Sequence, residues 1–101
     1  MIRRIVHMSF DPDAVETFQA LFDESCERIR AFPGCRELTL LQSVEEPNRF
    51  TTYSLWEDDD SLQAYRQSDL FRLTWARTKV LFNDRPTATS HRIVRHLPQQ
   101  T

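Results

Sequence analysis

Glycine is almost absent from this chain, since Gly34 is the only one among 101 residues. Loops that cradle phosphate groups need several glycines, because the backbone has to approach the phosphate closely. The scarcity of glycine therefore excludes the Rossmann and P-loop motifs, together with the nucleotide cofactors that those motifs hold.

A basic surplus and long apolar runs are also lacking. The formal net charge is −2, whereas a nucleic-acid partner usually requires a basic face. Arg3, Arg4, Arg92 and Arg95 are interleaved with apolar residues, so we interpret them as solvated strand edges or ion-pair partners. No apolar run approaches the ~20 residues of a membrane span, and no signal-peptide pattern opens the chain. We therefore expect a soluble, cytoplasmic protein that binds neither nucleic acid nor a membrane.

Cysteine is scarce as well, with only Cys26 and Cys35 present. Each falls in a segment with other apolar residues, so two buried thiols are a better interpretation than a disulfide. Free thiols fit a reducing compartment. No Cys or His residues are paired at a spacing of two to four, so the sequence predicts no metal site.

Aromatic side chains are plentiful by contrast, with seven Phe, two Trp and two Tyr. Residues 2–10 alternate as a strand whose apolar face carries Ile2, Val6, Met8 and Phe10. The pair Asp11-Pro12 then predicts a helix start. Val15, Phe18, Phe22, Cys26 and Ile29 form the apolar seam of that helix. The segment Phe32-Pro33-Gly34 ends it, with Gly34 suited to a left-handed conformation.

The second half of the chain predicts a hairpin, a helix in two pieces and a last strand. Residues 35–44 and 49–57 are two strands joined by the polar turn 45–48. At the acidic run 57–61, residue types typical of a strand give way to residue types typical of a helix start. A further helix begins at Ser68-Asp69. Its seam is Phe71, Trp75, Thr78 and Phe82. Residues 87–97 predict the fourth strand, and residues 98–101 a short tail.

The resulting order, β-α-β-β-α-β, predicts an α+β, ferredoxin-like fold in one domain over residues 1–101. In this fold both helices lie on one face of a four-stranded antiparallel sheet. The opposite sheet face also carries apolar residues, namely Ile5, Leu41, Tyr53 and Leu55, whereas a solvated face would be mostly polar. We therefore expect a homodimer in which two sheets cover each other as a barrel. By alternation His7 points into that barrel as a buried, satisfied histidine.

A resemblance to a known family rests on three segments. They are Arg49-Phe50-Thr51-Thr52-Tyr53-Ser54-Leu55-Trp56-Glu57, then Asp58-Asp59-Asp60-Ser61-Leu62-Gln63-Ala64-Tyr65, then Ser68-Asp69-Leu70-Phe71. This pattern resembles the antibiotic biosynthesis monooxygenase (ABM) family of small dimeric α/β-barrel proteins. Two positions depart from the family pattern, because a Glu is replaced by Ser54 and a His by Tyr65.

The resemblance implies oxygenation of a small aromatic or quinol-like compound without a cofactor. Such an enzyme has to hold a substrate anion in an apolar pocket and keep water away from it. On this hypothesis Trp56 and Tyr65 are the catalytic residues, and Trp56 lies at the mouth between sheet and helix. Substrate-binding residues are Met8, Ser54, Phe71 and Trp75.

Two other branches of the family fit less well. The haem-degrading branch binds iron through a His at the position of Trp75, and an indole nitrogen cannot ligate iron. The isomerase branch uses histidines at the positions of Tyr65 and Leu70. Neither activity is therefore expected.

Two alternatives to an enzyme stay open. A dimeric binding module would sequester an apolar aromatic metabolite without converting it, and the missing Glu and His favour that alternative. A purely structural dimer would use the same aromatic residues only for core packing, which for Phe71 is the favoured interpretation.

Overall fold

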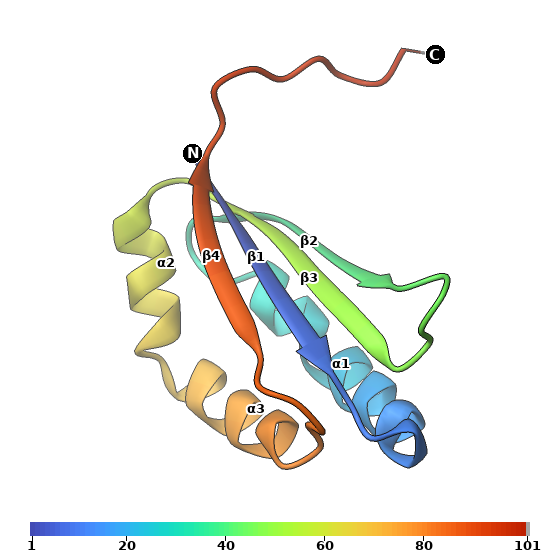
Figure 1. The fold of residues 1–101 in the computed structure, drawn as a ribbon. Coiled ribbons are helices and arrows are strands. Elements are labelled where there is room, and N and C mark those ends of the chain that lie inside the picture. The colour runs from blue at the N-terminus through green and yellow to red at the C-terminus, as the bar shows by residue number, and fades with distance from the viewer. Residues whose placement is uncertain (101) are drawn as a thin grey trace.

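The computed structural model describes residues 1–100 and contains a four-stranded antiparallel sheet with three α-helices on one face (Figure 1). The elements are β1 (Ile2–Ser9), the short 3-10 helix η1 (Pro12–Ala14), α1 (Val15–Arg30), β2 (Cys35–Gln42), β3 (Arg49–Trp56), α2 (Asp59–Arg66), α3 (Asp69–Lys79) and β4 (Thr87–Arg92). The strand order is β2-β3-β1-β4. Both the ferredoxin-like topology and the division of the second helix are confirmed.

The sheet has two distinct faces because side chains alternate along each strand. β1 pairs with β3 so that Ile2 lies opposite Trp56, Val6 opposite Thr52 and Met8 opposite Phe50. These pairs face the helices. At one end of the sheet, Phe10 stacks on Phe18 with ring centroids 4.1 Å apart. This packed cluster anchors α1 to the sheet.

Side-chain caps start the helices where the sequence predicts them. Asp11 accepts a hydrogen bond from the N–H of Asp13 and so caps η1, which leads into α1. Asp58 accepts one from the N–H of Ser61 at the start of α2. Ser68 accepts one from the N–H of Phe71 at the start of α3. Such caps satisfy N–H groups that have no partner inside the helix.

Gly34 turns the chain between α1 and β2 with a φ angle of +88°. A Cβ atom built at this position would lie 2.3 Å from the Oγ of Ser61, a residue of α2. The backbone therefore passes directly against the first turn of α2, which only glycine allows.

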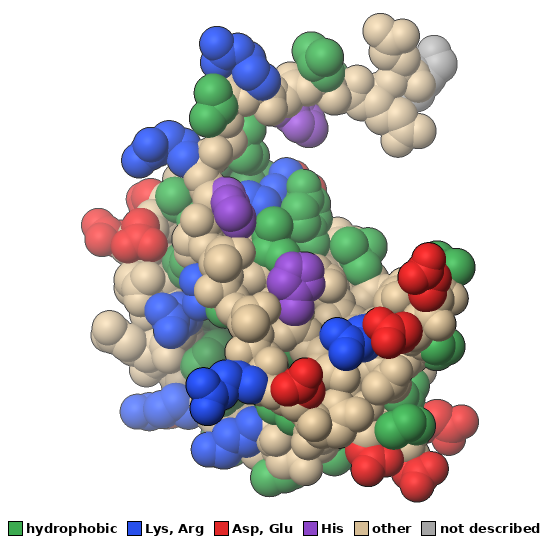
Figure 2. Space-filling view, in the orientation of Figure 1, with side chains coloured by type: hydrophobic (Ala, Val, Ile, Leu, Met, Phe, Trp, Pro, Cys, Tyr) green, Lys and Arg blue, Asp and Glu red, His purple; other side chains and the backbone are tan. Residues whose placement is uncertain are grey.

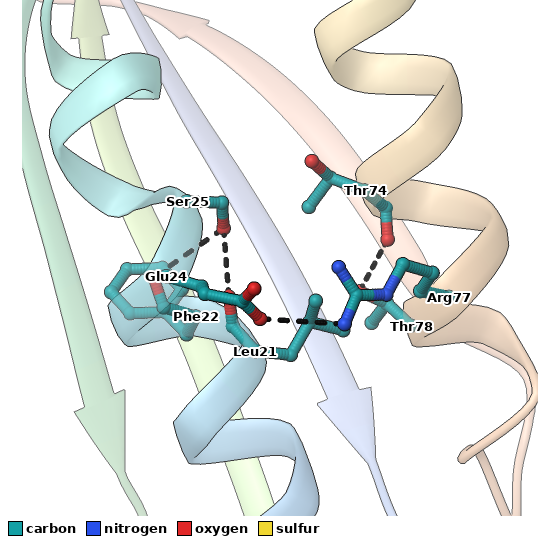
Figure 3. Close-up of polar contacts among 7 residues, drawn as sticks. All are labelled: Leu21, Phe22, Glu24, Ser25, Thr74, Arg77 and Thr78. Atoms are coloured by element: carbon teal, nitrogen blue, oxygen red, sulfur yellow. Dashed lines mark hydrogen bonds and ion pairs between the residues drawn. The ribbon is translucent and has the colours of Figure 1, made fainter.

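α1 and α3 approach each other through small polar side chains (Figure 3). Ser25 of α1 donates to the carbonyl of Leu21 at 3.0 Å, and Thr78 of α3 donates to the carbonyl of Thr74 at 2.8 Å. Each hydroxyl is satisfied within its own helix, so both can be buried in the interface without cost from an unpaired donor. Nearer the surface, Arg77 and Glu24 form an ion pair with 3.3 Å between nitrogen and oxygen.

Three sequence-based expectations are corrected. The last strand ends at Arg92 and does not continue to residue 97, because Arg92 pairs with Ile2, the first residue of β1, and the described part of the chain offers no strand partner beyond that pair. The strand predicted over residues 35–44 ends at Gln42, where the hairpin turn begins. Cys26 is half-buried on α1, whereas Cys35 is buried as expected. Of the expected tail, residue 101 lies outside the described residues.

The sheet face away from the helices is open (Figures 1 and 2). None of the helices within residues 1–100 covers it. Tyr53 and Leu41 are exposed there, as predicted, whereas Leu55 is buried. Figure 2 shows hydrophobic and histidine side chains gathered on this face.

Candidate functional site

A cavity of about 280 Å³ lies between the helices and the sheet. Its size is close to the lower end of the ~300–1,000 Å³ range of small-molecule sites. β1 and β3 form its floor, and α1, α2 and α3 form its walls. Eighteen residues line it: Arg4, Val6, Met8, Phe18, Phe22, Ile29, Leu38, Thr52, Ser54, Trp56, Leu62, Tyr65, Arg66, Phe71, Thr74, Trp75, Thr78 and Ala88.

The structure brings all six predicted site residues to this one cavity. They are Met8, Ser54, Trp56, Tyr65, Phe71 and Trp75. The four aromatic members form a continuous wall. Trp56 stacks on Tyr65 at 5.0 Å between centroids, Tyr65 meets Phe71 edge to face at 5.2 Å, and Phe71 stacks on Trp75 at 5.8 Å. A wall of this kind suits a flat aromatic ligand.

Trp56 lies deeper than the sequence suggests. Its side chain is 1% exposed and packs with Leu62 and Cys35, so it forms the inner end of the cavity and not the mouth. The indole Nε1 donates a 3.0 Å hydrogen bond to the Oγ of Ser54. The two residues are neighbours on one face of β3 because they are two positions apart on the strand. This bond fixes the Trp56 ring and leaves the Ser54 hydroxyl hydrogen free for another acceptor.

Tyr65 supplies a hydroxyl donor to the cavity. Burial, followed by the nearby Cys35 thiol, raises the pKa of the Tyr65 phenol far above its usual range. The phenol therefore stays protonated and cannot act as a base near neutral pH. No partner for its hydroxyl occurs among residues 1–100, so the group can donate a hydrogen bond to a ligand.

Of the cavity residues that the sequence did not predict for the site, Arg4 and Arg66 are the charged ones. Arg4 was interpreted as a solvated or ion-paired arginine, but it is half-buried and points to the helix side of β1. The alternation of Ile2, Val6 and Met8 contains the signal for this placement, because position 4 shares their face. Arg66 is the last residue of α2, and its exposure shows that the cavity opens at that end.

Apart from these two arginines and Tyr65, no titratable side chain within residues 1–100 lines the cavity. The histidines lie elsewhere. His7 is on the open sheet face and contacts the Oγ1 of Thr51 at 3.0 Å, and His91 contacts the Oγ1 of Thr89 at 2.9 Å. His7 is exposed in the single chain, whereas the sequence predicts it to be buried in a dimer.

A second hollow of about 460 Å³ lies on the open sheet face, near the β2–β3 hairpin. Its lining mixes His7, Arg49, Asp84 and Arg85 with a few apolar residues. Although this hollow is larger than the cavity under the helices, it is not enclosed by aromatic side chains. We therefore take the cavity under the helices as the functional site.

Within residues 1–100, no three His, Cys, Asp or Glu side chains gather closely enough to hold a metal ion. No helix in the same range has the length and apolar character needed to cross a membrane.

Several solved structures share this arrangement of sheet, helices and cavity-forming elements. A crystal structure of an antibiotic biosynthesis monooxygenase is 20% identical, superposes with a TM-score of 0.88, and covers 94% of this chain and 100% of its own. A conserved protein from Methanosarcina mazei Go1 is 23% identical with a TM-score of 0.86 over 90% of both chains. Rv0793 from Mycobacterium tuberculosis is 21% identical with a TM-score of 0.87, covering 96% of this chain and 98% of its own. At such identities these likenesses establish the fold.

The sequence itself gives the family. The fold is that of an α+β, ferredoxin-like protein with a cavity between sheet and helices. Residues 1–77 match the family model of the antibiotic biosynthesis monooxygenases, and the chain belongs to that family. Among proteins of curated function, none matches the sequence.

Proposed function

We propose that this chain is a single-domain, cofactor-independent monooxygenase that acts on a small aromatic or quinol-like compound. The observation that carries the proposal is the stacked wall from Trp56 through Tyr65 and Phe71 to Trp75, which lines one cavity in a member of the ABM family. In this role Trp56 and Tyr65 contact the reacting part of the substrate, and Met8, Ser54, Phe71 and Trp75 bind it.

The reaction needs no external reductant. An electron-rich phenolate or enolate passes one electron to oxygen, and the resulting radical pair recombines at a ring carbon. Loss of water then turns a CH₂ group into a carbonyl, so that one oxygen atom enters the substrate and the other leaves as water. All four electrons come from the substrate. The protein holds the anion, orients it and excludes water from the radical pair.

The residues of the cavity suit these tasks. The Tyr65 hydroxyl and the free hydrogen of Ser54 can both donate to substrate oxygens, while the Trp56 ring is held by its bond to Ser54. The aromatic wall supplies an apolar surface on which a flat ring can stack.

The sheet geometry supports the homodimer as part of this proposal. Tyr53 and Leu41 are exposed on a sheet face that no described helix covers. A second copy of the same sheet would bury these side chains. Such a pairing also brings the exposed His7 into an interface. The free thiols of Cys26 and Cys35 support a reducing compartment such as the cytoplasm.

The alternative function is a binding module that sequesters an aromatic metabolite without converting it. The observation that favours it is the lack of a carboxylate or histidine among the described cavity residues. Such a module would use the same aromatic wall.

Oxygen uptake by the purified protein tests the proposal. The substrates are anthrones, naphthols and hydroquinones, and no cofactor is added. We expect uptake above the autoxidation rate and a roughly ten- to hundredfold loss in Trp75→Ala, because a misplaced substrate loses most of the benefit of orientation. Leu73→Ala is the matched control, since Leu73 lies on the same helix but is 69% exposed.

Each result separates the hypotheses. Wild-type rates in Trp75→Ala would contradict this cavity as the active site. No uptake, together with tryptophan quenching by the same compounds and their recovery unchanged, would establish the binding module. No uptake and no quenching would leave only a structural dimer.

A further inference from the structure

We propose that the cavity binds its aromatic ligand in an anionic form, with the ionised oxygen held by Arg4 and Arg66 where the cavity opens. This inference rests on the proposed function, because it concerns the same cavity. It adds the two residues that hold the ionised oxygen and a route to the anion that needs no protein base.

The two arginines come from different elements and meet at one end of the cavity. Arg4 is the third residue of β1, where it pairs with Ser54 of β3 on one side and Ser90 of β4 on the other. Arg66 ends α2, directly after Tyr65. Both line the cavity together with Ala88 of β4, which is exposed. The opening therefore lies between α2 and β4, and both guanidinium groups border it.

The positive charge at this opening is not neutralised by ion pairs. Within residues 1–100, the five ion pairs closer than 4.0 Å involve neither Arg4 nor Arg66. Their hydrogen bonds go to neutral groups: Arg4 donates to the Ser90 hydroxyl at 3.0 Å and Arg66 to the Gln63 side chain at 3.4 Å. Burial and the charge of Arg66 lower the pKa of Arg4, and Asp59 opposes this shift only in part. An anion in the cavity would relieve the repulsion between the two cations.

The rest of the cavity makes an anion the fitting ligand. Its described residues include no carboxylate, and the hydroxyls of Ser54 and Tyr65 can donate hydrogen bonds. Binding of an ionised phenol or enol also removes the need for a protein base, since the proton is released to solvent on binding. Each unit by which the arginines lower the pKa of a bound phenol raises its ionised fraction about tenfold. The replaced Glu and His of the family pattern, now Ser54 and Tyr65, are then not required for deprotonation.

The probe is 4-nitrophenol, which absorbs visible light only as its phenolate. Its absorbance, titrated against pH with saturating protein, gives the pKa of the bound form, and tryptophan quenching gives its affinity. We expect the bound pKa to fall by about one unit, which is a tenfold preference for the anion. Arg4→Gln and Arg66→Gln should each remove most of this shift, and Arg4→Lys should keep part of it. Arg28→Gln on the outer side of α1 removes the same charge and should change nothing. Arg66 is exposed, so its variant tests the inference even if Arg4→Gln does not fold.

Two further ligands test whether binding depends on the charge of the ligand. 4-Nitroanisole is the neutral match and should bind about tenfold more weakly than the phenolate. 4-Nitrobenzoate carries its charge on a carboxylate, and its binding would show that an acidic substituent is what the arginines hold. Equal binding of the anisole and the phenolate would overturn the inference and leave the proposed function intact. A pKa shift that persists in both glutamine variants would overturn the assignment to these arginines. If no ligand binds, both the inference and the proposed function fail.

Discussion

Arg3 and Arg4 are neighbours in sequence, yet they lie on opposite faces of the sheet in opposite electrostatic surroundings. Arg3 faces the open side, where its guanidinium stacks over the Tyr53 ring at 4.1 Å and lies 3.6 Å from a Glu37 carboxylate oxygen. Arg4 faces the helices, borders the cavity and has no carboxylate partner among the described residues. Arg3 therefore has an aromatic and a carboxylate neighbour within the chain, although its buried Nη1 makes no hydrogen bond among the described residues, whereas Arg4 has neither neighbour at such a distance. We infer that the charge of Arg4 stays available for a ligand.

The same contrast extends to the two faces as a whole. The covered face has an aromatic cavity with two arginines at its opening, whereas the open face has a hollow of mixed lining near the β2–β3 hairpin and carries exposed Leu41 and Tyr53. We infer that the first face binds a small molecule and the second binds another copy of the chain. Separate substitutions can test each half of this division.

The largest expected effect is on the open face. Leu41→Glu should raise the dimer dissociation constant at least about a hundredfold, because a buried unpaired charge costs roughly 3–5 kcal/mol. Sedimentation velocity would then show a species of 12.0 kDa. Leu73→Glu makes the same change on the exposed side of α3 and should leave the dimer intact. A monomeric wild-type protein would contradict the division of faces.

The pH dependence of turnover tests the covered face. The described cavity residues include no carboxylate or histidine, and the raised pKa of Tyr65 keeps its phenol protonated near neutrality, so none of them can act as the base. The value of kcat should therefore rise about tenfold per pH unit below the pKa of the bound substrate and level off above it. A substrate with a pKa about one unit lower should shift the profile down by about one unit. A midpoint that stays fixed across substrates would instead reveal a protein base.

Removal of one hydroxyl should have a smaller effect. Tyr65→Phe keeps the stacking on Trp56 but loses the only hydrogen that the phenol can donate. We expect turnover to fall up to about tenfold, in line with one hydrogen bond of roughly 0.5–1.5 kcal/mol. Oxygen uptake measures the change, and thermal unfolding serves as the control for folding. Wild-type turnover in this variant would remove Tyr65 from the mechanism.

The smallest effect is expected for Arg3→Gln. Loss of the cation–π contact with Tyr53 should lower the free energy of unfolding by about 1 kcal/mol, as measured by urea denaturation. Quenching by 4-nitrophenol should not change, in contrast to Arg4→Gln. If both variants weakened ligand binding alike, the contrast between the two arginines would be wrong.

Much of the fold could be predicted because its signals are local. Alternation in the strands, the caps at Asp11, Asp58 and Ser68, and the break at Gly34 each depend on a few adjacent residues. The end of β4 could not be predicted, because it depends on where β1 begins and not on the residues after Arg92. Strand boundaries of this kind are set by the partner strand.

The candidate site was predicted only in part, because some of its residues carry a local signal in the sequence and others do not. Trp56 and Phe71 belong to the family pattern, and Phe71 and Trp75 share a helical spacing, and all three reach the cavity. Arg4 was missed because the interleaving of arginine with apolar residues was interpreted as a strand edge, although β1 is central in the sheet. Arg66 gave no local signal, since an arginine at the end of a helix is most simply a favourable partner of the helix dipole.

Gly34 has a consequence for anyone who wishes to change what this cavity accepts. The glycine lines no part of the cavity, but its missing side chain is what allows Ser61 to lie against the α1–β2 turn. The helix seated by this contact also carries Tyr65 and Arg66. A larger residue at position 34 would push that helix outward and widen the opening of the cavity. Position 34 therefore affects what the cavity accepts, although it does not line the cavity.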